Sequence, residues 1–188
     1  MDSNAYDLLP SQFGAFGIVW GITENGPRVY RVALPWGDRS AEQRIHAETQ
    51  APLTRAEIRG PRLHDLAARL QALLEGEVVD LPLNLLAWER CPAFQQRVLR
   101  AEHAIPRGWV STYGRLARHL GIPTGARAVG NALARNPFPL FIPCHRAVRS
   151  DGSLGGYQGG LAMKRALLAF EGVEVDSADH IAVPRLWY

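Results

Sequence analysis

The residues best suited to chemistry are a neighbouring cysteine and histidine in the run Pro143-Cys144-His145-Arg146. A thiol reacts as its thiolate, and a nearby base lowers the thiol pKa from about 8.5. His145 is the obvious base, but adjacent side chains of an extended chain point to opposite sides. We therefore expect a bridging water, or a turn at the motif, to connect Cys144 with His145. A structural role is the alternative, because a buried cysteine often serves only as a small hydrophobic side chain.

The elements before this motif must position the thiol. The apolar run Pro139-Leu140-Phe141-Ile142 predicts a buried extended segment that ends at the cysteine. Two short helices are predicted upstream, over residues 111–120 and 124–135, with Ser111 and Thr124 as their caps. A tight Gly-Ile-Pro turn joins them, which is typical of a helix-turn-helix. An αα-hairpin within an ordinary core remains the alternative.

The second of these helices has two unlike faces. Its inward stripe consists of Val129, Ala132 and Leu133, and its outward positions at i, i+4 and i+8 are Arg127, Asn131 and Arg135. Between the outward residues, Ala128 and Gly130 are small enough to allow a partner to approach closely. The outward face is therefore basic and small.

Charge along the chain is unevenly distributed. The formal net charge is +3, but residues 91–165 carry 11 basic and 2 acidic side chains, a net of +9, whereas residues 1–90 carry 9 and 12, a net of −3. A basic block within a folded segment is the electrostatic pattern of a nucleic-acid binder, because each neutralised phosphate releases counterions. A solvated arginine-rich surface would give the same count.

The rest of the chain predicts an α+β protein. Alternating apolar residues over 15–34, with an Asn-Gly turn between two runs, indicate a β-hairpin of half-buried strands. Helical spacing is found over Pro61–Glu75 and again over Pro92–Ala104. We predict an N-terminal domain with a small antiparallel sheet and helices, and a mostly helical C-terminal domain with a helix-turn-helix and an active-site cysteine loop. The expected boundaries are 1–88, 89–175 and a tail at 176–188.

Length and composition exclude several classes. The 188 residues, 47% of them hydrophobic, suffice for one ordinary domain or two small ones. No stretch approaches the roughly 18 apolar residues of a membrane span, and the first ten residues are acidic where a signal peptide is basic. Cys91 and Cys144 are the two cysteines, too few for a disulfide scaffold or a cysteine-rich metal site. We expect a protein of the cytoplasm, nucleoid-associated if bacterial, that uses no membrane and no metal.

A longer pattern surrounds the cysteine. Its parts are Phe94-Gln95-Gln96, Ser111-Thr112-Tyr113-Gly114, Arg127-Ala128-Val129-Gly130-Asn131-Ala132-Leu133, Asn136-Pro137, Ile142-Pro143-Cys144-His145-Arg146, Gly155-Gly156-Tyr157-Gln158-Gly159-Gly160 and Leu167-Leu168-Ala169-Phe170-Glu171-Gly172. Together they resemble the O6-alkylguanine-DNA alkyltransferases, also called methylated-DNA–protein-cysteine S-methyltransferases. The resemblance covers residues 92–173, while residues 1–88 match only as that family's weakly patterned N-terminal domain.

The resemblance implies a role for each catalytic position. Cys144 corresponds to the acceptor that takes the alkyl group from guanine O6 and becomes a thioether. His145 corresponds to the base that polarises the thiol through a water, and Glu171 to the carboxylate that orients it. Asn136 corresponds to the residue that holds the turn before the active-site strand. Tyr113 corresponds to the hydroxyl that hydrogen-bonds guanine N3 and assists departure of the base.

The same resemblance implies a substrate pocket and a DNA-binding helix. The backbone carbonyls of Cys144 and Ala147 would accept from the exocyclic amine, and a backbone N–H at Tyr157-Gln158 would donate to O6. The alkylated base must be flipped out of duplex DNA, and Arg127 would fill the gap. The DNA-contacting set is Tyr113, Arg127, Ala128, Gly130, Asn131 and Arg135, with the helix in the minor groove. The implied protein is a monomer that uses no cofactor and acts once.

Some positions depart from the family pattern. Gln158 stands where a small hydroxyl residue is frequent, and Ala147 where a larger β-branched residue is common, so the pocket can differ in size. No cysteine in residues 1–88 supports the zinc site of some relatives. A non-catalytic alkyltransferase-like protein, which binds the lesion without repairing it, is the alternative function, but such proteins lack the acceptor cysteine. A regulator that senses alkylation would need a further DNA-binding domain or a second acceptor cysteine.

Overall fold

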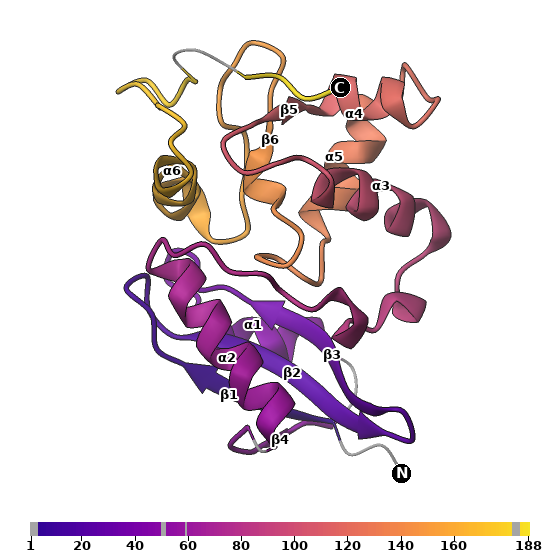
Figure 1. Cartoon of the computed structure of the whole chain (residues 1–188), viewed down its shortest axis with the longest axis vertical. Helices are drawn as coiled ribbons and strands as arrows, with labels where there is room; N and C mark the ends of the chain where they lie inside the picture. The colour runs from indigo at the N-terminus through magenta and orange to yellow at the C-terminus, as the bar shows by residue number, and fades with distance from the viewer. Residues whose placement is uncertain (1–3, 50–51, 59, 182–184) are drawn as a thin grey trace. The chain divides into compact units, whose positions relative to one another are not determined.

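The structure is a computed structural model that describes residues 4–49, 52–58, 60–181 and 185–188 (Figure 1). The chain divides into two compact units. One unit contains residues 1–90 and 137–141, and the other contains residues 91–136 and 142–188. The segment after residue 175 therefore folds with the second unit.

A four-stranded sheet, in the order β3-β2-β1-β4, forms the first unit. The strands are β1 (Ala5–Leu9), β2 (Phe16–Thr23), β3 (Gly26–Ala33) and β4 (Thr54–Arg55). β2 pairs antiparallel with β3, which confirms the predicted hairpin, and also with β1. The two-residue β4 pairs parallel with β1, so the sheet is mixed rather than wholly antiparallel.

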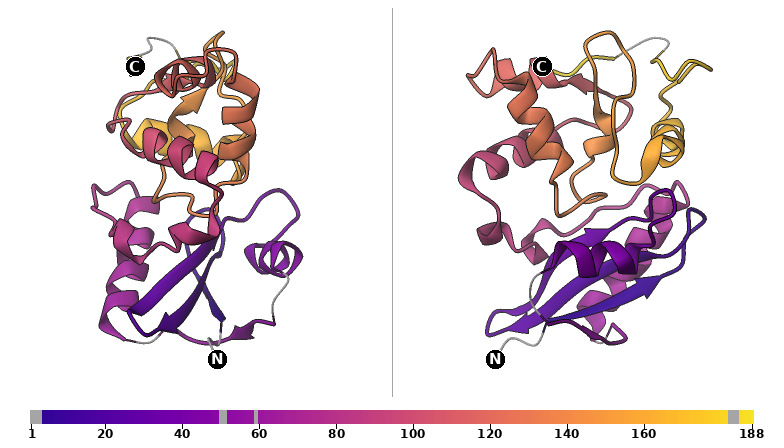
Figure 2. Two further views of the ribbon diagram at one scale, coloured as in Figure 1. Left: turned by 90° about the vertical axis from the view of Figure 1, so that its right-hand side faces the viewer. Right: turned by 180° about the vertical axis from the view of Figure 1, so that it is seen from behind.

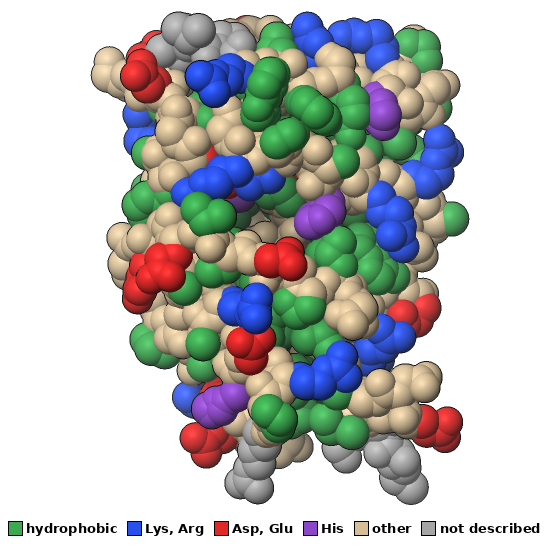
Figure 3. All heavy atoms as spheres, in the orientation of Figure 1, with side chains coloured by type: hydrophobic (Ala, Val, Ile, Leu, Met, Phe, Trp, Pro, Cys, Tyr) green, Lys and Arg blue, Asp and Glu red, His purple; other side chains and the backbone are tan. Residues whose placement is uncertain are grey.

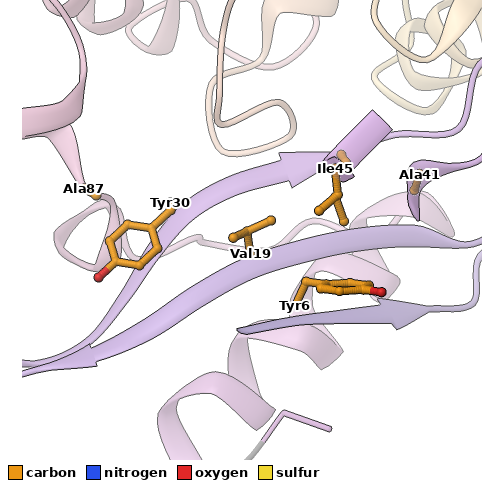
Figure 4. Packing of buried hydrophobic residues seen from close by; sticks show 7 residues of the cluster. Tyr6, Val19, Tyr30, Ala41, Ile45 and Ala87 are labelled. Carbon is orange, nitrogen blue, oxygen red and sulfur yellow. The ribbon is translucent and has the colours of Figure 1, made fainter. Parts of the chain in front are cut away.

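Helices cover both faces of this sheet. α1 (Ala41–Glu48) lies on one face and α2 (Pro61–Leu74) on the other, as the views in Figures 1 and 2 show. The prediction of a half-buried strand is wrong for β2, since residues 16–21 are all buried. The physical reason is that a strand with both faces covered has no solvent side. On the α1 face, Val19 and Ile45 belong to a cluster of buried residues (Figure 4).

The second unit is mostly helical. Its helices are α3 (Ala93–His103), α4 (Tyr113–His119), α5 (Ala126–Ala134) and α6 (Gly160–Phe170). Two short strands, β5 (Ser111–Thr112) and β6 (Ala147–Val148), pair in parallel. The described residues also form short 3₁₀ helices: η1 (Leu83–Leu85) and η2 (Trp88–Arg90) in the first unit, and η3 (Cys144–Arg146) in the second.

Both predicted helix caps are wrong by one residue. Thr112 caps α4, because its hydroxyl accepts from the Arg115 amide at 3.2 Å, while Ser111 is held in β5 by pairing with β6. Gly125 precedes α5 and supplies no side-chain cap, so Thr124 has no such role. The helix-turn-helix arrangement of α4 and α5 is otherwise present at the predicted place.

The predicted extended segment before the cysteine is also wrong. Residues 139–142 contain a turn in which Leu140 has φ of 76°, and Cys144 begins the helical turn η3. An apolar run alone does not separate a strand from a buried turn. A turn at the motif is one of the two expected ways of bringing the cysteine and histidine into one site.

The C-terminal segment 185–188 runs beside β5 (Figure 1). The Val110 amide donates to Arg185 O at 2.9 Å, the Trp187 amide donates to Val110 O at 2.8 Å, and the Ser111 hydroxyl donates to Trp187 O at 2.8 Å. Tyr188 stacks on His119 of α4 with ring centroids 3.8 Å apart. The segment thus stabilises the position of β5, the strand that leads into α4.

Candidate active site

Cys144 is buried, and its thiol lies against an asparagine side chain. The residue is 7% exposed, and Asn136 Nδ2 donates to Sγ at 3.4 Å and to Ile142 O at 3.3 Å. Asn136 is fully buried just past the end of α5, so it connects that helix with the cysteine turn. Burial raises the thiol pKa to about 11, against a smaller lowering by the Asn136 hydrogen bond. The resting thiol is therefore protonated.

The histidine after the cysteine is held by a carboxylate. His145 Nε2 lies 2.8 Å from Glu171 Oε1, and the two side chains are 3% and 5% exposed. Arg146 donates to both oxygens of Glu171, at 2.7 and 2.9 Å, and to Ile105 O at 2.6 Å. Burial alone would raise the pKa of Glu171, but the hydrogen bonds and charges of His145 and Arg146 outweigh it and lower the pKa to about 2. Glu171 is accordingly ionised.

These contacts fix the state of the imidazole. Burial lowers the pKa of His145, with Glu171 opposing, so the ring is neutral near pH 7. A carboxylate can only accept, hence Nε2 carries the proton and Nδ1 is left as an acceptor. Nδ1 is buried and has no hydrogen-bond partner among the described residues. His145 thus has a free basic nitrogen inside the site.

Two tyrosines and a glycine loop lie around the thiol. Tyr113 is the first residue of α4, and a Cβ built on Gly155 would lie 3.2 Å from its hydroxyl. Tyr157 stands perpendicular to His145 with ring centroids 6.2 Å apart, and its buried hydroxyl has no partner in the described structure. Burial is the main cause that raises the pKa of both phenols, with the Cys144 charge adding to it. Glycine at 155 leaves room beside the Tyr113 hydroxyl.

Several contacts of the site were not foreseen from the sequence. Gln158 Nε2 donates to Asn136 O at 2.8 Å, which links the glycine loop to the end of α5. Lys164 Nζ donates to the carbonyl of Ala147 at 2.6 Å, and Ala147 is fully buried in β6. Arg146 belongs to the motif around the cysteine, but nothing in its spacing reveals the ion pair with Glu171. The carbonyl of Ala147 thus already accepts one hydrogen bond.

The outward face of α5 has the predicted pattern. Arg127, Ala128, Asn131 and Arg135 are exposed, Gly130 is half-buried, and Val129, Ala132 and Leu133 are buried. A Cβ on Gly130 would lie 3.8 Å from the Tyr113 ring, so this face adjoins the site. Gln95 Nε2 fixes the end of the helix by donating to Ala132 O and Arg135 O at 3.1 and 2.9 Å. The basic side chains that Figure 3 shows over α3 and α4 are arginines, since Lys164, the one lysine of the sequence, is buried on α6.

Two kinds of site were not found in the described residues. No group of three or more His, Cys, Asp or Glu side chains there could hold a metal ion. Among the same residues, no helix is both long and apolar enough to cross a membrane.

Known proteins are similar to this chain in both sequence and fold. Residues 93–173 match the family model described as "6-O-methylguanine DNA methyltransferase, DNA binding domain". The methylated-DNA–protein-cysteine methyltransferase of Methanothermobacter thermautotrophicus is 38% identical over 145 residues, which are 77% of this chain and 81% of that protein. The chain belongs to the methylated-DNA–protein-cysteine methyltransferase family. A family member from Mycolicibacterium paratuberculosis is 43% identical over 103 residues, 55% of this chain and 61% of the relative.

Solved methyltransferase structures match the fold of nearly the whole chain. A crystal structure of Mycobacterium tuberculosis OGT in complex with DNA matches with a TM-score of 0.70 and 30% identity, over 89% of this chain and 93% of that one. The O6-methylguanine-DNA methyltransferase of Pyrococcus kodakaraensis matches with a TM-score of 0.66 and 28% identity, over 89% and 99%. The α+β class predicted from the sequence is confirmed, and the methyltransferase likeness extends into the first unit.

Proposed function

We propose that this protein is a DNA-repair alkyltransferase that flips O6-alkylguanine out of duplex DNA and transfers the alkyl group irreversibly to Cys144. One observation carries the proposal: a buried thiol lies beside a neutral histidine whose free nitrogen, Nδ1, has no partner among the described residues. Glu171 holds the opposite ring nitrogen. Family membership supports the enzyme class.

Transfer begins with deprotonation of the thiol. Nδ1 of His145 accepts no hydrogen bond from Cys144 or any other described residue, so the proton leaves Sγ through a water that donates to Nδ1. The resulting imidazolium is stabilised by ionised Glu171. The thiolate then attacks the alkyl carbon in line, the S–C bond forms, and the C–O6 bond breaks with its electron pair on the guanine.

The departing guanine needs hydrogen-bond donors. Tyr113 is suited to donate its hydroxyl to guanine N3, because burial raises its pKa and keeps it protonated. The backbone N–H at Tyr157-Gln158 would donate to O6. Ala147 O would accept from the exocyclic amine with its second lone pair, since Lys164 occupies the first. The guanine anion finally takes up one proton, which balances the proton that His145 removed from the thiol, and remains in the DNA as ordinary guanine.

The exposed face of α5 is the proposed DNA contact. Arg127 would enter the duplex and fill the place of the flipped base, while Ala128 and Gly130 let the helix approach the minor groove. Asn131 and Arg135 extend the same face along the helix. A minor-groove helix of this kind reads few base edges, so a lesion is accepted in any sequence context.

The product explains why the reaction stops. An S-alkylcysteine has no carbonyl or phosphoryl centre for water to attack, so Cys144 is consumed after one transfer. The proposed transfer uses thiol, imidazole and phenol groups throughout and needs no cofactor. We infer that the protein acts as a monomer, one lesion per chain, in the cytoplasm or on the nucleoid.

The decisive experiment uses duplex DNA that carries O6-methylguanine labelled in the methyl group. Peptide mapping should find one equivalent of label on the peptide that contains Cys144, and none on Cys91. Tight binding of the lesion with no transfer of label would favour the alternative of a non-catalytic lesion-binding protein. Transfer beyond one equivalent would refute the single-use mechanism.

A further inference from the structure

Among the described residues of the second unit, two completely buried ionisable side chains transfer no proton or alkyl group in the mechanism above. Glu102 on α3 and Lys164 on α6 are both 0% exposed. Lys164 donates to the carbonyls of Ala147 and Leu154. Neither carboxyl oxygen of Glu102 has a hydrogen-bond partner among the described residues. Glu102 therefore fixes no neighbouring group by hydrogen bonding.

Such a pair is costly to the fold. Burial of an unpaired carboxyl carries a desolvation penalty, and replacing a buried ionisable pair by hydrophobic residues is often neutral or stabilising. Glu102 accepts no hydrogen bond from the described residues that would offset this penalty. Ionisable groups kept in unfavourable surroundings cluster at functional sites, which makes the surroundings of Glu102 informative.

The side chains around Glu102 include groups that take part in the proposed reaction. The titratable and charged side chains that interact electrostatically with Glu102 include Lys164 on α6, Arg146 and Cys144 on η3, Tyr113 on α4 and Tyr188 in the C-terminal segment. Lys164 in turn interacts with His145 and Arg149 as well as with Cys144. Cys144 is the proposed acceptor and Tyr113 the proposed donor to the leaving base. The carbonyl held by Lys164 belongs to Ala147, three residues after the acceptor.

We propose that Glu102 and Lys164 form a positioning pair behind the acceptor, in which Lys164 fixes the Ala147 carbonyl and the charge of the two side chains together sets the pH range of alkyl transfer. This inference rests on the proposed alkyl transfer. It adds two positioning residues that touch neither substrate nor reacting atoms.

The charge of the pair changes sign near pH 8. Burial raises the pKa of Glu102 to about 8 and lowers that of Lys164 to about 8. Below that pH a neutral Glu102 (0) and a charged Lys164 (+1) give +1, and above it an ionised Glu102 (−1) and a neutral Lys164 (0) give −1. Positive charge favours the Cys144 thiolate and negative charge opposes it. The pair thus restrains the gain in thiolate that rising pH would otherwise bring.

The test is the pH dependence of single-turnover transfer from labelled duplex by wild type and Glu102→Gln. Below about pH 7 both proteins carry a neutral side chain at this position, so their rates should agree. Above pH 8 only the wild type gains a negative charge, and the variant should be faster by about tenfold at about pH 9.5, the effect of one buried charge at moderate distance. Glu89→Gln, at an exposed position, is the matched control and should follow the wild type.

A second variant should diverge most in the opposite pH range. Lys164→Met removes a positive charge that is present below about pH 8 and, at every pH, the hydrogen bond to the Ala147 carbonyl. Transfer should therefore be slower than wild type throughout, with a larger deficit below about pH 8 than above about pH 9. Glu102→Leu protects the test against misfolding, because a hydrophobic side chain suits this site. It should show the same pH profile as Glu102→Gln.

A measurement without DNA separates this inference from the proposed function. Iodoacetamide modification of Cys144, followed by peptide mapping from about pH 6 to about pH 11, reports the thiol pKa directly. That pKa should fall by about one unit in Glu102→Gln, which is the same tenfold effect. Superimposable profiles for wild type and Glu102→Gln in both assays would overturn the inference. Absence of transfer by the wild type, with the thiol pKa still shifted in the variant, would overturn the proposed function alone.

Discussion

Replacing Glu171 by glutamine tests two proposed effects of this carboxylate at once: stabilisation of the protonated His145 ring and stabilisation of the fold. The pKa of Glu171 falls from its ordinary 4.5 to about 2, which corresponds to about 3 kcal/mol of stabilisation in the ionised state. The folded pKa lies below the unfolded one, so this stability is fully present above pH 4.5 and is lost as the pH falls toward 2. Glu171→Gln keeps the shape but loses the charge. It should therefore be less stable near pH 7 by about 3 kcal/mol, since Arg146 loses its counter-ion in a nearly buried site.

The rate of alkyl transfer by Glu171→Gln should fall by more than its loss of folding stability accounts for. A glutamine oxygen can still accept from Nε2 of His145, but it cannot stabilise the imidazolium that forms when the thiol proton arrives. Comparable losses in other triads are about 10⁴ in rate. The assays are single-turnover transfer and urea unfolding between pH 2 and pH 7, with Glu174→Gln at an exposed position as control. If the stability of Glu171→Gln falls between pH 4.5 and pH 2 as steeply as that of the wild type, the electrostatic reasoning is refuted.

Three further predictions concern other contacts. Cys144→Ser should bind lesion DNA but transfer nothing, because a serine hydroxyl stays protonated near neutral pH; measurable label on the variant in a peptide map would remove the acceptor assignment. Arg127→Ala should slow repair of duplex at least about tenfold more than reaction with free O6-benzylguanine, since only the duplex leaves a gap to fill, and equal losses would contradict that role. Deleting residues 185–188 removes three hydrogen bonds to Val110 and Ser111 and the two that Tyr188 makes with Ala101 and Arg115, at about 1 kcal/mol each. The unfolding free energy should therefore drop by about 5 kcal/mol, whereas an unchanged value would show that the segment is dispensable.

The sequence predicts those parts of the fold whose signals are local. The β2–β3 hairpin and helices α2 and α3 have strong periodicity, and their predicted bounds lie within about a residue of the observed ones. α1 was not predicted because only Ala41 and Ile45 face inward, although its capping box of Ser40 and Gln43 was readable. β4 is two residues long and exists through pairing with a distant strand, which no local pattern records.

The candidate site was likewise predictable where the signal is local and unpredictable where it depends on distant contacts. The resemblance around Cys144 predicts an acceptor, its histidine and the carboxylate Glu171 from residue identity alone, and the structure places His145 and Glu171 in contact. The contacts that close the site depend on distances between elements far apart in sequence. Gln158 reaches Asn136 across 22 residues, and Arg146 reaches Glu171 across 25. Neither side chain differs from an ordinary surface residue until the fold brings the partners together.

The burial of Cys144 suits the role proposed for it, an acceptor that is used once. A thiol with a pKa of about 11 is ionised in about one molecule in ten thousand at pH 7, roughly several hundredfold less than an ordinary cysteine. An exposed, ionised thiol would be lost to any electrophile or oxidant, and an alkylated thiol has no simple route back. Burial withholds reactivity until a flipped base lies against Sγ, when the relay through His145 and Glu171 can remove the proton. The low reactivity of the resting thiol is therefore consistent with the proposed single use of the protein. Lowering the resting pKa of Cys144 should speed repair while shortening the life of the unused protein.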